Sequence, residues 1–113
     1  MTGIGPKAVA MLFAAALLAS PAQAQQGPSI SALTNCAGAI GAHANINVVT
    51  YPQGASGEWS NVLGRILSQM NTMEGIEGMT GRYAASAART YWLEQPRADR
   101  EAAATQCRTR FGS

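Results

Sequence analysis

Apolar side chains recur at spacings of three and four residues in four stretches of this chain, which places them on one face of an α-helix in each stretch. The first stretch carries an apolar stripe made of Leu33, Cys36, Ala37 and Ile40. Ser29 or Ser31 can accept a hydrogen bond from a backbone N–H of the first turn, and the stripe fades near residues 43–45. The pattern therefore predicts a first helix that begins after one of these serines and ends near residue 45.

The second stretch is the most regular of the four. Its apolar face consists of Trp59, Val62, Leu63, Ile66, Leu67, Met70 and Met73, and its other face is polar. Ser56 is the expected N-cap, and Glu58 in the first turn suits the positive end of the helix dipole. Gly75 and Gly78 are expected to end this helix, because glycine readily adopts the left-handed conformation found after helices.

The third and fourth stretches are separated by Pro96. Residues 80–93 predict a helix whose inward stripe is Tyr83, Ala84, Ala87, Ala88, Tyr91 and Trp92. Its many alanines should let a neighbouring helix approach closely. Pro96 should end that helix and occupy the first position of the next, over residues 96–111. The stripe of this last helix is Ala103, Cys107 and Phe111.

Residues 46–51 are rich in β-branched side chains but have no second strand-like run to pair with. We therefore expect an extended connector whose Val and Tyr side chains lie on the helices. The four helices and their short connections predict an all-α fold, a small four-helix bundle.

The N-terminal region has the three parts of a secretory signal. Lys7 gives a short positive start, residues 8–19 form an apolar run, and Ala22 and Ala24 are the small residues expected before a cleavage site. We predict a signal peptide at residues 1–24, a helical domain at residues 25–113, and a periplasmic or secreted location. The apolar run is shorter than the roughly 20 residues of a membrane-spanning helix, so no membrane anchor is expected in the mature form.

Removal of the predicted signal leaves 89 of the 113 residues, with seven arginines, no lysine and six acidic residues. This net charge of one gives no reason to expect nucleic acid or an anionic membrane as a partner. A domain this small buries about 60–65% of its unfolded surface, so its stability is marginal without a covalent link.

The two cysteines, Cys36 and Cys107, provide that link in the predicted fold. An even cysteine count in a small exported domain indicates a disulfide, and each cysteine lies on the apolar stripe of its own helix. In the chain-entropy model, a bridge that closes so long a loop contributes roughly 4 kcal/mol. A redox pair or a nucleophile is the alternative, but neither cysteine lies in a Cys-x-x-Cys motif. The only histidine, His43, lies roughly 10 Å from Cys36 by helix rise.

We also considered metal binding, acid–base catalysis and phosphate or calcium binding. Met70, Met73 and Met79 with His43 form the one conceivable copper(I) ligand set, although methionine is an ordinary core residue. Glu74 and Glu77 lie in a glycine-rich turn, and no phosphate-binding loop or calcium loop is present. We therefore predict a protein that is not an enzyme and has no cofactor, metal or catalytic residue.

Two functional hypotheses follow. The first is an exported, non-enzymatic binding or accessory protein of the cell envelope with a protein partner. Its partner face would be either an exposed part of the Tyr and Trp surface or the arginines Arg97, Arg100, Arg108 and Arg110. The arginines can also be a simple solvated face, and the aromatic residues can be core. The alternative function is a periplasmic carrier of a small ligand or copper, held between helices near His43. The oligomeric state is not determined by the sequence.

Overall fold

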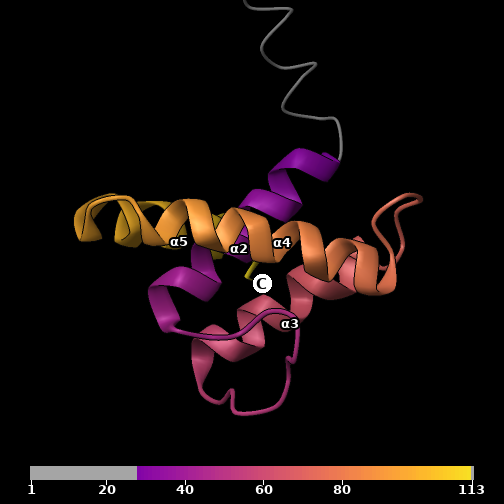
Figure 1. The fold of residues 1–113 in the computed structure, drawn as a ribbon, viewed down its shortest axis with the longest axis horizontal. Coiled ribbons are helices and arrows are strands. Elements are labelled where there is room, and N and C mark those ends of the chain that lie inside the picture. The colour runs from indigo at the N-terminus through magenta and orange to yellow at the C-terminus, as the bar shows by residue number, and fades with distance from the viewer. Residues whose placement is uncertain (1–27, 113) are drawn as a thin grey trace, which may run out of the picture.

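The computed structural model describes residues 28–112, so the signal peptide predicted at residues 1–24 lies outside the described residues. The described part contains four helices and no strand: α2 (Ile30–Ala44), α3 (Glu58–Met70), α4 (Gly78–Leu93) and α5 (Arg97–Phe111) (Figure 1). This confirms the predicted all-α fold. None of these four helices combines the length and the apolar character needed to cross a membrane.

α2 is the central helix of the bundle. The other three helices each pack on it and touch one another only sparsely, and α4 crosses in front of it in Figure 1. Leu33, Ala37 and Ile40 of the predicted stripe are completely buried. Burial also extends to every residue from 36 to 42, because α2 has neighbours on several sides. The small side chains of this segment make such packing possible.

Both ends of α2 lie where the sequence predicts them, and Ser29 is one of the two predicted N-caps. The Ser29 hydroxyl oxygen accepts a hydrogen bond from the Ala32 N–H at 3.0 Å. Asn45 adopts the left-handed conformation after the last turn, with a φ of 57°. Asparagine is among the few non-glycine residues that tolerate this conformation, so the helix ends here.

The segment after α2 consists of successive turns, and the expected extended connector is wrong. The Asn47 carboxamide oxygen accepts a hydrogen bond from the Val49 N–H at 2.9 Å, and this side-chain bond bends the backbone. Ile46 and Val48 are nevertheless buried, and the Tyr51 hydroxyl donates to the Ser60 carbonyl oxygen of α3 at 2.9 Å. The expectation that these side chains lie on the helices is therefore confirmed.

The apolar face of α3 lies as predicted. Its buried apolar residues are Val62, Leu63, Ile66, Leu67 and Met70, and Trp59 and Met73 are partly buried against the same core. Ser56, however, is not the N-cap: Gly57 occupies that position, with a φ of 88° and without a side-chain cap bond.

α4 is rotated relative to the prediction. Gly81 and Ala85 are its buried residues, whereas Tyr83 and Tyr91 are 62% and 53% exposed and Ala87 is also exposed. The cause is the close approach of α4 to α2. A Cβ placed on Gly38 of α2 would lie only 2.6 Å from the Ala88 carbonyl carbon. A tyrosine does not fit at so short a distance, so the small residues of α4 face α2 and the tyrosines face away from it.

The buried stripe of α5 differs from the predicted stripe at one position, where Ala104 takes the place of Ala103. Ala104, Cys107 and Phe111 are buried, whereas Ala103 is only partly buried. The helix starts at Arg97 with Pro96 as its cap, and α4 starts at Gly78 instead of Thr80. Such shifts of one or two residues are usual at helix ends.

The predicted disulfide is present. Cys36 and Cys107 are bonded, with 5.5 Å between their Cα atoms, and each residue is 5% exposed. The bond joins the middle of the central helix to the third turn of the last helix, so it closes the bundle as predicted.

Candidate functional site

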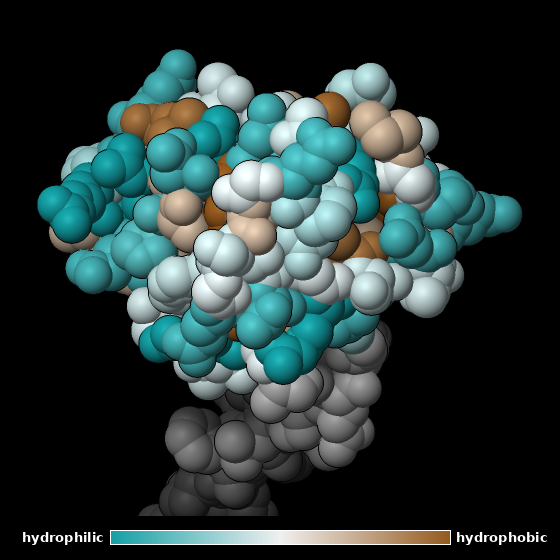
Figure 2. Space-filling model, turned by 90° about the horizontal axis from the view of Figure 1, so that it is seen from below, coloured by the Kyte–Doolittle hydropathy of each residue, from teal (hydrophilic) through white to brown (hydrophobic). Residues whose placement is uncertain are grey.

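The outer face of α4 carries a row of exposed apolar side chains. The row follows the spacing i, i+4, i+8, i+12 and consists of Met79, Tyr83, Ala87 and Tyr91; we call it the α4 row. Met79 is 47% exposed, in addition to the exposed tyrosines. By contrast, hydrophilic residues dominate the face shown in Figure 2, where hydrophobic residues appear only as separate small patches.

The two charged residues of α4 both attach the helix to the rest of the molecule. Arg82 donates hydrogen bonds to the carbonyl oxygens of Val49 and Tyr51 in the connector. Arg89 donates from Nε to the Gly41 carbonyl oxygen at 3.1 Å, near the end of α2, where the same oxygen also accepts the Ile46 N–H. Both arginines therefore hold α4 to the rest of the molecule and do not contribute to its outer face.

Carboxylates lie at both ends of the α4 row. Glu77 immediately precedes α4 and Glu94 immediately follows it, and both residues are exposed. An exposed glutamate thus lies just beyond each end of the helix that carries the row, and the carboxylate of Glu77 accepts a hydrogen bond from the Gly75 N–H at 3.0 Å.

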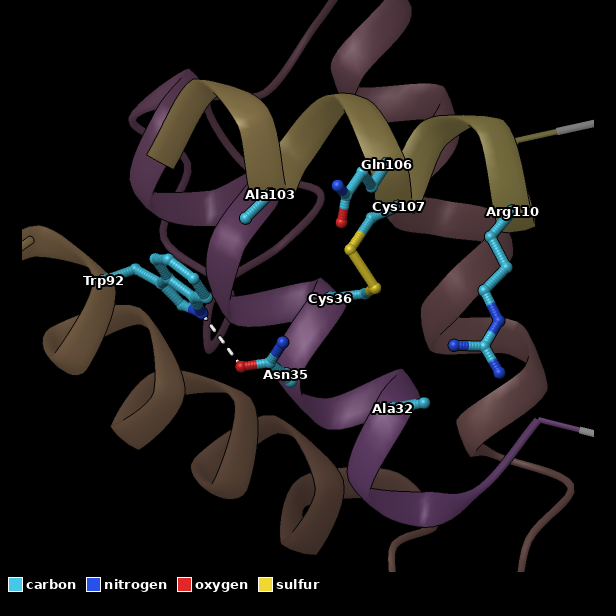
Figure 3. Close-up of a pocket in the computed structure, with 8 residues that line it drawn as sticks. All are labelled: Ala32, Asn35, Cys36, Trp92, Ala103, Gln106, Cys107 and Arg110. Atoms are coloured by element: carbon cyan, nitrogen blue, oxygen red, sulfur yellow. Dashed lines mark hydrogen bonds between the residues drawn. A yellow bond between two sulfur atoms is a disulfide. The ribbon is translucent and has the colours of Figure 1, made fainter. Parts of the chain in front are cut away.

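A second feature is a groove between α2, α4 and α5 with a volume of about 260 Å³ (Figure 3). We call it the Trp92 groove. Its lining residues are Ala32, Asn35, Cys36, Trp92, Ala103, Gln106, Cys107 and Arg110. The disulfide lies in the middle of this group, with Trp92 and Arg110 on opposite sides of it (Figure 3).

One hydrogen bond fixes the aromatic wall of the Trp92 groove. The Trp92 Nε1–H donates to the Asn35 Oδ1 at 2.9 Å. This bond orients the indole ring and leaves the two N–H groups of the Asn35 carboxamide for other partners. Arg110 is the one charged side chain among the lining residues, so the groove is positive at one end.

The four predicted arginines all lie on α5 and make different contacts. Arg97 is exposed. Arg100 donates to the Leu93 carbonyl oxygen at 3.1 Å, at the end of α4. Arg108 and Arg110 lie two residues apart on α5, and only Arg110 lines the Trp92 groove.

Arg108 belongs instead to a small cluster at the start of α3. Its guanidinium lies 3.3 Å from a carboxylate oxygen of Glu58 and 4.7 Å from the centre of the Trp59 ring. The His43 ring also packs on Trp59, edge to face, with 5.0 Å between the two ring centres. The contacts join the ends of α2, α3 and α5, which gives the cluster a structural role.

The proposed copper ligands are not brought together. His43 lies against Trp59 near the start of α3, whereas Met70 is the last residue of α3 and is buried in the core. Met79 is exposed at the start of α4. Within residues 28–112, no three His, Cys, Asp or Glu side chains form a group that could hold a metal ion.

Sequence reasoning missed Asn35 and Gln106. Each directly precedes one of the two bonded cysteines, so it projects beside the disulfide when the cysteine points into the core. A polar residue next to each buried cysteine was the available signal. This signal indicates a shared site only when α2 and α5 are known to lie side by side at the disulfide.

Comparison of the chain with protein-family models, with curated proteins and with solved structures found no match.

Proposed function

We propose that this protein is an exported, non-enzymatic binding protein of the cell envelope that recognises a protein partner through the α4 row. The observation that carries the proposal is the exposure of Tyr83 and Tyr91 on one side of a helix whose other side packs on α2. Tyrosine is enriched at protein interfaces because it offers a large apolar contact area together with a hydroxyl group.

The charges around the α4 row indicate the chemistry of the partner. A second copy of this chain is a poor partner. A parallel or an antiparallel pair of α4 helices would place the carboxylates of Glu77 and Glu94 beside carboxylates of the other copy. Like charges that meet at an interface cost several kcal/mol. We therefore expect a different protein, with an apolar groove that receives the row and with basic residues at both ends of that groove.

Export is supported by the predicted signal at residues 1–24 and by the disulfide, which persists in oxidising compartments. Fractionation of the native cells followed by intact-mass analysis tests this part of the proposal. The expected protein starts at Gln25, lies outside the cytoplasm and has no free thiol. A full-length cytoplasmic protein with two free thiols would refute export.

A copper carrier that uses His43 and the methionines has less support, because these side chains lie in different parts of the molecule. It would require a rearrangement that separates His43 from Trp59 and takes Met70 out of the core. We therefore favour the binding protein.

Site-specific photo-crosslinking in the native cells tests the partner surface. A photoreactive phenylalanine replaces Tyr83 or Ala87 on the α4 row, Arg97 on α5, or Thr72 beyond the end of α3. We expect one discrete adduct from positions 83 and 87 and none from positions 97 and 72. An adduct from position 97 alone would favour the arginines as the partner face and would refute the α4 row.

The identified partner is then purified and its affinity is measured directly. Tyr83→Ser should weaken binding by about tenfold or more, as truncation of an aromatic anchor does. Glu94→Lys should slow association at low salt, because it removes a charge that attracts the basic rim. Thr72→Ala is the matched surface control and should bind normally. Unchanged binding by Tyr83→Ser would refute the proposal.

A further inference from the structure

The Trp92 groove has the chemistry of a small-molecule site. Its walls come from three helices, and its volume of about 260 Å³ is close to the lower end of the range of ligand sites, about 300–1,000 Å³. Only a small compound fits. The groove is separate from the α4 row: Trp92 is its one residue on α4, and this residue lies outside the row.

The planar part of such a compound has an apolar surface to lie on. The indole of Trp92 is held in one orientation by Asn35 at 2.9 Å, and the methyl groups of Ala32 and Ala103 line the groove with the disulfide. Figure 3 shows Ala103 on the same side of the disulfide as the indole ring and Ala32 on the side of Arg110. A fixed indole offers a surface for stacking or edge contact with an aromatic ring.

The polar part of such a compound would find several hydrogen-bond donors in the groove. Arg110 supplies a guanidinium with several N–H donors, and Gln106, one turn before it on the helix, supplies a carboxamide. Asn35 has two further N–H donors, since its oxygen is bonded to Trp92. Among residues 28–112, none of those that line the groove is acidic. A carboxylate is the group that this donor set, with its single positive charge, recognises best.

Trp92 and Arg110 lie on opposite sides of the disulfide (Figure 3). A ligand that meets both must therefore carry its planar ring and its carboxylate at opposite ends. We infer that the Trp92 groove binds a small organic anion in which a short chain joins an aromatic ring to a carboxylate. The ring lies against Trp92, and the carboxylate accepts hydrogen bonds from Arg110.

NMR titration of the exported, oxidised protein tests this inference with 3-phenylpropionate as the probe. The signals to follow are the Trp92 indole N–H and the side-chain amides of Asn35 and Gln106. The Trp59 indole, at the start of α3, is the internal reference. At millimolar probe we expect a saturable shift of the groove signals and no shift of Trp59. The absence of any saturable shift of the groove signals would refute the inference.

Two further compounds separate the features of the ligand. 3-Phenylpropionamide, which has no charge, should bind about tenfold more weakly, as expected when a charge-assisted hydrogen bond is lost. Acetate, which has no ring, should not saturate the groove at the same concentrations. Equal binding of the amide would refute recognition of an anion. Equal binding of acetate would show an adventitious ion only and would also refute the inference.

Variants identify the groups involved. Arg110→Gln should weaken the binding of 3-phenylpropionate by about tenfold, as expected for loss of a charge-assisted hydrogen bond. Arg97→Gln is the matched arginine control on the same helix. Equal effects of the two variants would indicate general charge attraction and would refute a site. Tyr83→Ser should leave the titration of the groove unchanged. The inferred ligand site and the proposed partner surface are therefore tested independently, and either can be refuted alone.

Discussion

α4 and α5 both pack on the central helix α2, but they are attached to it in different ways. α4 approaches so closely that a Cβ on Gly38 would lie 2.6 Å from backbone atoms of Ala88 and Arg89. α5 contributes only Ala104, Cys107 and Phe111 to the core, and one of these is covalently bonded to α2. The first attachment depends on the complementary shape of two backbones, and the second depends on a bond.

The different attachments of α4 and α5 explain where the free surfaces of the molecule lie. Close packing on α2 uses small residues of α4, so Met79 and the two tyrosines of α4 face outward in the α4 row. The looser contact of α5 leaves a groove beside the disulfide. A helix held by a bond does not need a continuous apolar contact, so polar residues such as Gln106 can line the space between the helices.

The largest expected effect comes from removal of the bond. The variant with Cys36→Ala and Cys107→Ala should lose about 4 kcal/mol of unfolding free energy, because the unfolded chain regains the entropy that the closed loop removes. Denaturant unfolding measures the loss, and hydrogen exchange should show that α5 loses protection before α4. Equal loss of protection in α4 and α5 would contradict the view that α5 is held mainly by the disulfide and α4 by close packing.

A smaller loss is expected at the contact between α2 and α4. Gly38→Ala places a methyl group against the Ala88 backbone, and overpacking of this kind costs about 1–3 kcal/mol. The better helix propensity of alanine offsets up to about 1 kcal/mol. Combination with Ala88→Gly removes one of the clashing atoms and should recover part of the loss in a double-mutant cycle. A Gly38→Ala variant as stable as the native protein would show that the two backbones can separate without cost.

A still smaller effect is expected from the non-covalent contact that assists α5. Arg108→Gln removes the interaction with the Trp59 ring and the partly exposed ion pair with Glu58, together about 0.5–1 kcal/mol. Thermal unfolding of the oxidised protein measures this change. Arg97→Gln on the same helix is the control and should have no effect. A loss as large as that of the disulfide would show that α5 is held mainly by side-chain contacts.

The smallest effect on stability is expected on the outer face of α4. Tyr83→Ser and Tyr91→Ser should each change the unfolding free energy by no more than about 0.5 kcal/mol, as exposed substitutions usually do. Denaturant unfolding checks this. A loss of several kcal/mol would mean that the tyrosines are part of the packed core, as their apolar pattern suggested.

Local pattern was sufficient for much of this fold. The stripe of α2, the apolar face of α3 and the pairing of Cys36 with Cys107 were all predicted correctly. The two faces depend on the apolar pattern of a single helix. The pairing also required that the chain has two cysteines, each on the stripe of its helix, and that the domain is predicted to be exported. The turns after Asn45 were missed because β-branched composition outweighed the local bond made by the Asn47 side chain.

The candidate sites could not be predicted in the same way. Ala84, Ala87 and Ala88 with the neighbouring aromatics formed a wide apolar arc, and periodicity alone did not indicate which edge of the arc faced inward. Gly38, on another helix, decided this. Likewise, Asn35 and Gln106 lie more than 70 residues apart in the sequence and line one groove where α2 and α5 are joined by the disulfide.

The sequence by itself determined four helices, the faces of the first two and the cysteine bridge, because side-chain periodicity and compartment chemistry act locally along the chain. Only the tertiary structure decided the rotation of α4, and with it the exposure of Tyr83 and Tyr91 and the position of Trp92 beside the disulfide. The physical reason is the distance between two backbones. Where a glycine allows helices to approach closely, the smallest side chains occupy the contact, and the larger apolar ones are left on the surface.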